Sequence, residues 1–139
     1  MEKWQGAAGI CLNEHNQLLM VLQGSLNEEK TWSVPSGMKE DGEDFVSCCI
    51  REVEEETGYV VEVIEKLLVK EEEQKELSLQ VKVHYFAVKI TGGSPAIQDP
   101  DQLIYEISWK SAEEVENLNL TYPNDKEFLL RIMASHSVR

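Results

Sequence analysis

The sequence predicts an α+β fold, in which helices pack on the faces of a mixed β-sheet. Segments typical of strands outnumber segments typical of helices, and the two kinds follow one another in a mixed order. Apolar and polar residues alternate over residues 77–90, which is typical of a long strand. The chain has 139 residues, a length that suits one domain with a real core. We therefore expect residues 1–139 to form a single domain.

The other strands are expected where β-branched and apolar residues gather between turn-forming residues. Residues 3–11 and 17–23 flank a turn at Asn13–Asn16, and this arrangement predicts a hairpin. Residues 71–75 are charged and predict a turn before the long strand, which Gly92 to Pro95 then interrupts. The remaining expected strands are residues 31–34, 60–70 and 103–109.

Helices are expected in the middle and near the end of the chain. The main helix should run from about Glu43 to Thr57, with Gly58 in the position of a C-terminal cap. Ser111 and Glu114 have the spacing of a capping box, which predicts a short helix. A final amphipathic helix is expected over residues 124–135, with an apolar face made of Phe128, Leu129, Ile132 and Met133.

Composition narrows the class of protein. The net charge of −13 disfavours non-specific binding to a nucleic-acid backbone. No apolar run approaches the roughly 18 residues of a membrane span, and the N-terminus lacks the order of a secretory signal. Cys11, Cys48 and Cys49 have no metal-ligand spacing, and we interpret them as small packing residues in a reduced compartment. We therefore expect a cytoplasmic protein with no membrane partner.

The stretch from Gly37 to Tyr59 holds eight acidic residues in 23 positions. On a helix, three of them fall within an arc of about 100°, and these are Glu52, Glu55 and Glu56. An adjacent face that can pack inward carries Val46, Cys49, Ile50 and Val53. Like charges at these spacings repel, so the cluster destabilises the helix unless a cation sits beside it. Carboxylate ligands suit Mg²⁺ or Mn²⁺ rather than zinc. The alternative is a solvated acidic helix face.

The flanks of this cluster make the pattern more specific. Gly37 is followed after five residues by Glu43, and after a further seven by Arg51-Glu52-Val53-x-Glu55-Glu56-x-Gly58. This stretch resembles the Nudix box of the Nudix hydrolase family. Ser36 stands where the family often has a second glycine, and Tyr59 replaces the usual aliphatic residue, but neither change removes a carboxylate. The resemblance is strong in the box and loose elsewhere, and it implies a Nudix-like α/β/α sandwich with a mixed central sheet.

The resemblance also implies a set of metal ligands. Glu55 and Glu56 would bind divalent ions directly, and Glu52 would be a further ligand or would activate the attacking water. The carbonyl of Gly37 would add a ligand from the loop, because glycine allows close backbone approach. The cofactor expected from this set is Mg²⁺ or Mn²⁺.

Two charged residues would support these ligands. By resemblance, Arg51 orients a carboxylate through charge-assisted hydrogen bonds, and Glu43 ties the loop to the helix. The alternatives are a surface ion pair for Arg51 and a simple complement to the helix dipole for Glu43.

Many family members use a further carboxylate outside the box, just before the late strand. Leu103 occupies the first position considered for it here. Asp99, Asp101, Glu106 and, in the loop, Glu40 are the candidates, and each could equally be a plain surface acid.

Aromatic residues outside the box could stack on a nucleobase, although core packing is their commoner use. The candidates are Trp4, Trp32, Tyr85 and Trp109. His84 lies in an apolar strand, and we interpret it as a structural histidine.

The activity implied by the resemblance is hydrolysis of a nucleoside diphosphate linked to another group. Family markers for ADP-ribose, dinucleoside polyphosphates and coenzyme A are absent, which favours a pyrophosphatase of nucleoside or deoxynucleoside triphosphates, oxidised ones included. Polar segments 24–30 and 92–102 are expected to read the base.

Two other functions remain open. An RNA 5′-end pyrophosphohydrolase would keep the chemistry, but the acidic composition counts against a nucleic-acid partner. A non-catalytic nucleotide-binding regulatory module would be expected to lack box carboxylates, and all are present. The expected partner is therefore a small-molecule nucleotide, bound by a monomer or a homodimer.

Overall fold

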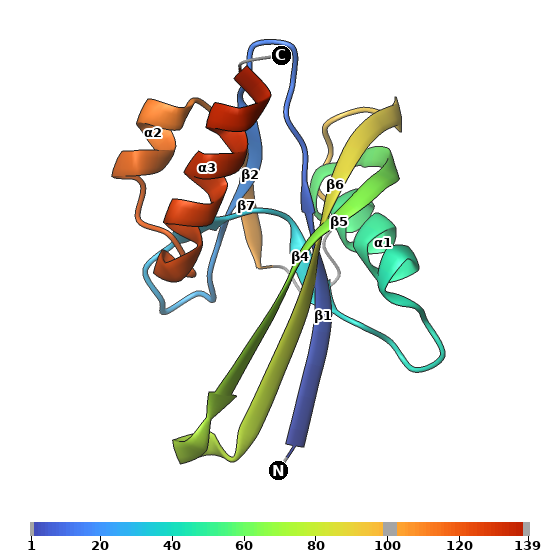
Figure 1. The fold of residues 1–139 in the computed structure, drawn as a ribbon, viewed down its shortest axis with the longest axis vertical. Helices are drawn as coiled ribbons and strands as arrows, with labels where there is room; N and C mark the ends of the chain where they lie inside the picture. The colour runs from blue at the N-terminus through green and yellow to red at the C-terminus, as the bar shows by residue number, and fades with distance from the viewer. Residues whose placement is uncertain (1, 99–102, 138–139) are drawn as a thin grey trace.

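The computed structural model describes residues 2–98 and 103–137, which form two β-sheets and the helices around them (Figure 1). The strands are β1 (Glu2–Ile10), β2 (Leu18–Gln23), β3 (Thr31–Ser33), β4 (Ser36–Met38), β5 (Tyr59–Gln74), β6 (Leu79–Gly93) and β7 (Ile104–Lys110). The helices are α1 (Phe45–Thr57), α2 (Ala112–Asn117) and α3 (Lys126–Ser137), with 3₁₀ turns at Lys75–Leu77 and Pro123–Asp125. None of the helices in these described ranges is long and apolar enough to cross a membrane.

The larger sheet is mixed, as the sequence predicts. Its strand order is β4-β1-β6-β5, and the smaller sheet has the order β3-β2-β7. β1 runs parallel to β6, from the pair Glu2–Leu79 to the pair Ile10–Ala87, and antiparallel to β4. β2 pairs antiparallel with both β3 and β7.

The predicted hairpin of the first two strands is wrong. β1 and β2 belong to different sheets. Near their connecting turn the two segments share the bridge between Leu12 and Leu18, with hydrogen bonds from the Leu19 amide to the Cys11 carbonyl and from the Asn13 amide to the Gln17 carbonyl. The physical reason lies in β1, whose two edges are occupied by β4 and β6. No edge of β1 is left for β2, which pairs with β3 and β7 instead.

The predicted charged turn at residues 71–75 is also wrong for most of its length. β5 continues to Gln74, and Glu71 faces Lys82 across the strand pair with their side chains 3.3 Å apart. Opposite charges on facing strands offset the poor strand propensity of these residues. The chain turns only at residues 75–78, where Ser78 adopts a φ of 48°.

Helices cover both sides of the strands, which confirms the expected sandwich. One apolar cluster joins α1 to one side, and alternate residues of the same strands pack on the other side towards α2 and α3. Ala7 thus faces the α1 side and Ala8 the α3 side.

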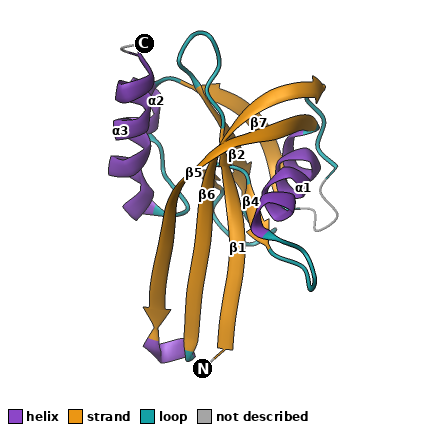
Figure 2. Ribbon diagram, turned by 45° about the vertical axis from the view of Figure 1, so that its right-hand side comes forward, coloured by secondary structure: helices purple, strands orange, loops and turns teal. Residues whose placement is uncertain are grey.

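Beyond this body, the far ends of β1, β5 and β6 extend together as an arm, and the N-terminus lies at its end (Figures 1 and 2).

Capping residues determine where α1, the helix that carries the acidic cluster, begins and ends. Asp44 caps its N-terminus by accepting a hydrogen bond from the Ser47 amide, so the helix begins two residues later than predicted. Gly58 ends it in the left-handed conformation, at φ 81°. Cys48 and Cys49 are fully buried as expected, whereas Val46, predicted on the inward face, is 41% exposed. The buried stripe of α1 consists of Cys48, Cys49, Val53, Glu56 and Thr57, and Val46 lies at its margin on the helix.

Candidate active site

A cleft of about 400 Å³ opens between α1, β4 and the start of β7. Most of the residues that the sequence singles out line it, namely Gly37, Glu40, Arg51, Glu52, Glu55 and Glu56. Glu43 lies behind them, bonded to Arg51. The cleft therefore gathers carboxylates from one helix and from the loop that precedes it.

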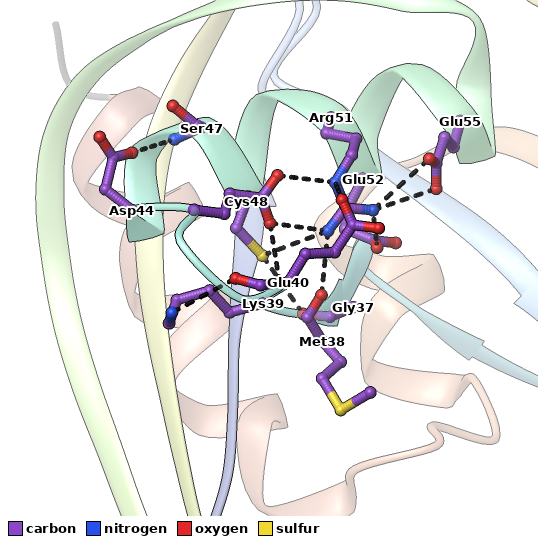
Figure 3. A network of polar contacts seen from close by, with 11 residues as sticks. Gly37, Met38, Lys39, Glu40, Asp44, Ser47, Cys48, Arg51, Glu52 and Glu55 are labelled. Atoms are coloured by element: carbon purple, nitrogen blue, oxygen red, sulfur yellow. Dashed lines mark hydrogen bonds and ion pairs between the residues drawn. The ribbon is translucent and has the colours of Figure 1, made fainter.

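Arg51 lies at the centre of this acidic group (Figure 3). Its Nε donates to Glu43 at 2.7 Å, and its Nη1 donates to Glu52 at 2.6 Å. The same Nη1 contacts the two oxygens of Glu55 at 3.4 and 3.3 Å, which are longer contacts. Nη2 donates to the Met38 carbonyl at 2.9 Å. One guanidinium thus joins carboxylates of the helix and of the preceding loop to the backbone at the end of β4.

Gly37 lies directly against the carboxylate of Glu52. A Cβ built at Gly37 would overlap the Glu52 carboxyl group, so only glycine allows this approach. The amide of Ser36 donates to Glu56 Oε1 at 3.2 Å, so the residue that replaces the family's second glycine keeps a backbone contact with the cluster. β4 and α1 are thereby joined at the floor of the cleft.

The ionisable side chains around the cleft have pKa values that are shifted by different causes. Hydrogen bonding from Arg51 lowers the pKa of Glu43 to about 2, despite the opposing effect of desolvation. Burial instead raises the pKa of Glu52, against the effect of the hydrogen bond from Arg51. The pKa of Arg51 is raised, chiefly by its hydrogen bond to Glu43, so the guanidinium stays charged. The cluster therefore contains one permanent cation among several carboxylates.

The donor set fits a hard divalent cation by its chemistry. Carboxylate oxygens of Glu40, Glu52, Glu55 and Glu56 line the cleft, and such oxygens are the ligands that Mg²⁺ and Mn²⁺ prefer. Within residues 2–98 and 103–137, however, no three acidic, histidine or cysteine side chains stand ready around a single point. The carboxylates of Glu40, Glu52 and Glu55 are directed towards Arg51 instead, and Glu56 accepts a hydrogen bond from the Ser36 amide. Glu40 and Glu55 have only the longer contacts with Arg51, at 3.3 Å or more.

The candidates for a further carboxylate lie in different places. Glu40 lines the cleft, and one of its oxygens lies 3.3 Å from Arg51 Nε. Glu106 lies on β7 opposite Leu22, is exposed, and does not line the cleft. Asp99 and Asp101 lie outside the described residues. Leu103, which holds the position first considered for an acid, does line the cleft.

The other cleft residues are not predicted as ligands by the sequence, although Trp4 is a candidate for base stacking and Ser36 precedes Gly37 of the box. They are Trp4 from β1, Gln23 from β2, Ser36 and Met38 from β4, Ile104 from β7, and Tyr122. Trp4 and Tyr122 come from opposite ends of the chain. Only the tertiary fold brings them to the box residues, so no local pattern could place them in the cleft.

The aromatic candidates for base stacking have different surroundings. Tyr85 is buried and donates to Asp125 at 2.8 Å, Trp109 packs against Tyr59, and Trp32 lies under Lys110. Of the four candidates, only Trp4 lines the cleft.

His84 stacks on Phe45 with ring centroids 3.7 Å apart. Burial lowers the pKa of His84, and the neighbouring charges of Lys66 and Lys82 lower it further. A neutral, stacked imidazole agrees with its interpretation as a structural histidine.

Comparison with known proteins agrees with the fold. A NUDIX domain model matches residues 3–132. The sandwich with a box helix over a carboxylate cleft is thus a Nudix-type domain, and the chain belongs to the Nudix family. Among solved structures, a NUDIX hydrolase from Nitrosomonas europaea shares the fold with a TM-score of 0.82 at 17% identity, covering 99% of this chain and 92% of that one.

Curated relatives include longer proteins. The chain is 29% identical over 133 residues to Nudix hydrolase 6 of Arabidopsis thaliana, covering 94% of this chain and 46% of that protein. It is 35% identical over 89 residues to a putative 8-oxo-dGTP diphosphatase of Bacillus subtilis (strain 168), covering 64% of this chain and 55% of that protein. The chain thus spans about half the length of these relatives, or less.

Proposed function

We propose that this chain hydrolyses a diphosphate bond in a nucleoside diphosphate linked to another group, in a reaction that depends on Mg²⁺ or Mn²⁺. The preferred substrate is a nucleoside or deoxynucleoside triphosphate, oxidised forms included, and the products are a monophosphate and pyrophosphate. The observation that carries this proposal is the gathering of Glu40, Glu52, Glu55 and Glu56 around one cleft, against the backbone at Gly37.

The carboxylates Glu52, Glu55 and Glu56, with the Gly37 carbonyl, would hold the divalent cations. Bound cations would offset the negative charge of the diphosphate and lower the pKa of a coordinated water. Glu55 is suited to turn towards such an ion, because its contacts with Arg51 are long. Arg51 keeps Glu52 in place through a 2.6 Å bond, and Glu43 in turn keeps Arg51 in place.

The similarity to a putative 8-oxo-dGTP diphosphatase supports a triphosphate substrate, since that relative is 35% identical over 89 residues. Other proteins of this fold have names that refer to different nucleotides, such as a UDP-X diphosphatase and an ADP-ribose pyrophosphatase. These are 20% and 16% identical, so they support the fold and not the choice of substrate.

A nucleotide panel tests the proposal. Purified protein with Mg²⁺ is offered nucleoside and deoxynucleoside triphosphates, their oxidised forms, ADP-ribose, nucleotide sugars and triphosphorylated RNA, and the phosphate products are identified. We expect the triphosphates to release pyrophosphate, and excess chelator to abolish this release. Full activity in excess chelator would refute metal dependence. Preferential turnover of ADP-ribose or a nucleotide sugar would overturn the choice of substrate, and preferential turnover of RNA would support the alternative partner.

A further inference from the structure

One carboxylate of the cleft between α1 and β4, which we call the acidic cleft, comes from outside the helix. This is Glu40, in the loop between β4 and α1. The others are on α1, namely Glu52, Glu55 and Glu56. The loop holds three more acids, none of which lines the cleft, and they are Asp41, Glu43 and Asp44. Within residues 2–98 and 103–137, Glu40 is therefore the one acid that lines this cleft from outside α1.

The wall of the acidic cleft at the start of β7 is apolar where the structure describes it. Leu103 and Ile104 line the cleft there, and neither side chain has an oxygen atom. Leu103 holds the position at which many family members have a further acid. Among the described residues, a cation that takes a carboxylate from outside the helix would therefore find it at Glu40.

A turn fixes the backbone of Glu40. Its amide donates to Glu43 Oε1 at 3.0 Å, and its carbonyl accepts from the Glu43 amide at 3.1 Å. The same Glu43 oxygen accepts from Arg51 Nη2 at 2.9 Å, so the turn is bonded to α1. The loop therefore holds Glu40 at a defined place on the wall of the cleft.

The side chain of Glu40, in contrast, has one long contact within the described part of the chain. Its Oε1 lies 3.3 Å from Arg51 Nε, and that nitrogen already donates to Glu43 at 2.7 Å. The side chain of Glu40 is 69% exposed, whereas that of Glu43 is 13% exposed. The Glu40 carboxylate can therefore turn towards a cation without breaking a short hydrogen bond and without uncovering buried surface.

We infer that Glu40 is a further ligand of a divalent cation in the acidic cleft, supplied by the loop. This inference rests on the proposed function, in which carboxylates of α1 hold such a cation. A carboxylate oxygen is the kind of ligand that Mg²⁺ and Mn²⁺ prefer, and an added negative charge among the ligands raises the affinity of a site. The cation would then join the loop to the helix, as Arg51 does through its bonds to Glu43 and Glu52.

Titration with Mn²⁺, followed by electron paramagnetic resonance in the absence of nucleotide, tests this role without requiring catalysis. Glu40→Gln keeps the shape of the side chain and removes its charge. We expect this variant to bind Mn²⁺ at least about 10-fold more weakly, because even the loss of an outer partner of a metal ligand costs that much. Asp41→Asn is the matched control, since Asp41 is the next residue, is exposed and does not line the cleft. It should bind Mn²⁺ as the wild type does.

A Glu43→Gln variant separates a ligand from a residue that acts only through Arg51. Glu43 has the shorter contact with Arg51 Nε, at 2.7 Å against 3.3 Å for Glu40, but it does not line the cleft. If Glu40 acted only by holding Arg51, Glu43→Gln would weaken Mn²⁺ binding more than Glu40→Gln does. We expect the reverse order. A smaller effect of Glu40→Gln than of Glu43→Gln, or native affinity in Glu40→Gln with an unchanged circular dichroism spectrum, would overturn the inference.

The outcomes also distinguish this inference from the proposed function. Native Mn²⁺ affinity in Glu40→Gln, with hydrolysis by the wild type still abolished by chelator, would refute only the role of Glu40. A wild-type chain that binds no Mn²⁺ would refute the metal site itself. Asp99→Asn and Asp101→Asn are titrated alongside, because both acids precede the late strand. Loss of affinity in either of them, with none in Glu40→Gln, would assign the further ligand to that position instead.

Discussion

Arg51 and the carboxylates around it form the most tightly connected polar group of the acidic cleft. Glu55 and Glu56 face the cleft from the last turns of α1 and are the proposed metal ligands. We expect Glu55→Gln and Glu56→Gln each to lower the rate of hydrolysis by at least about 10²-fold, as loss of a major electrostatic stabiliser does. Glu54→Gln is the control, because Glu54 does not line the cleft. Near-native rates in both site variants, with circular dichroism unchanged, would show the ligand assignment to be wrong.

The hydrogen bond from Arg51 to Glu43 leads to a prediction about the stability of the fold at acid pH. The pKa of Glu43 is about 2 in the folded chain, below its ordinary value of 4.5. A lowered pKa stabilises the fold above about pH 4.5, and this contribution is lost as the pH falls towards 2. In Glu43→Gln, the free energy of unfolding should therefore be lower at neutral pH and should fall less steeply over that range.

Urea unfolding at several pH values between 7 and 2.5 checks this expectation. Glu65→Gln, a change at an exposed position of β5, is the control for simple loss of a negative charge. Stability curves of wild type and Glu43→Gln that run parallel across the acid range would contradict the assigned role of the Arg51 bond.

At the scale of elements, the end of α1 depends on how closely the following chain packs on it. Gly58 has φ 81°, and an added Cβ would overlap the backbone of Ser94 and Ala96. Gly42 has a similar φ of 80°, but nothing lies within 4 Å of its Cβ position. Both alanine variants carry the left-handed backbone cost of about 1–2 kcal/mol. Gly58→Ala should lose about 1–3 kcal/mol more, because overpacking adds to that cost.

Denaturant midpoints of the two alanine variants separate these costs, because Gly42→Ala reports the backbone cost alone. Equal losses of stability would mean that the segment around Ser94 moves aside with no cost in free energy. The segment also donates from the Gln98 amide to the Glu55 carbonyl, at 2.8 Å, which ties it to the turn of α1 that carries a proposed ligand. A variant at Gly58 is therefore expected to weaken metal affinity as well.

Elements whose signals are local could be predicted from the sequence, and those that depend on distant partners could not. The cap at Gly58 and the capping box of Ser111 and Glu114 are confirmed, because each is determined within a few residues. The hairpin of the first two strands is wrong, because alternation marks a strand without naming its partner. The box residues were found by their spacing along the chain. The sequence marks Trp4 as a candidate for base stacking, but it does not place Trp4 or Tyr122 in the cleft, because both join it only through the pairing of β1 with β6 and the path of the chain after α2.

For the whole molecule, the carboxylate cluster predicts a stabilising effect of divalent ions. A ligand that binds only the folded chain at 100 times its dissociation constant adds about 2.7 kcal/mol. We expect Mg²⁺ or Mn²⁺ to raise the melting temperature by several degrees, whereas NaCl of the same ionic strength should not. Combined replacement of Glu52, Glu55 and Glu56 by glutamine should remove the difference between the two salts. An equal effect of Mg²⁺ on this triple variant would place the ion elsewhere.

The parallel pairing of β1 with residues 79–87 also sets the order in which the molecule can be assembled during synthesis. A nascent chain that has not yet reached Leu79 already contains the whole box, but β1 then has only the three residues of β4 as a partner. Pairing of such distant segments is slow, because a long loop must close before any contact forms. α1, which packs on β1 and β5, therefore has no complete sheet beneath it until β6 emerges from the ribosome. A ribosome-bound chain of this protein should thus carry its acidic motif well before it can bind a metal ion or a nucleotide.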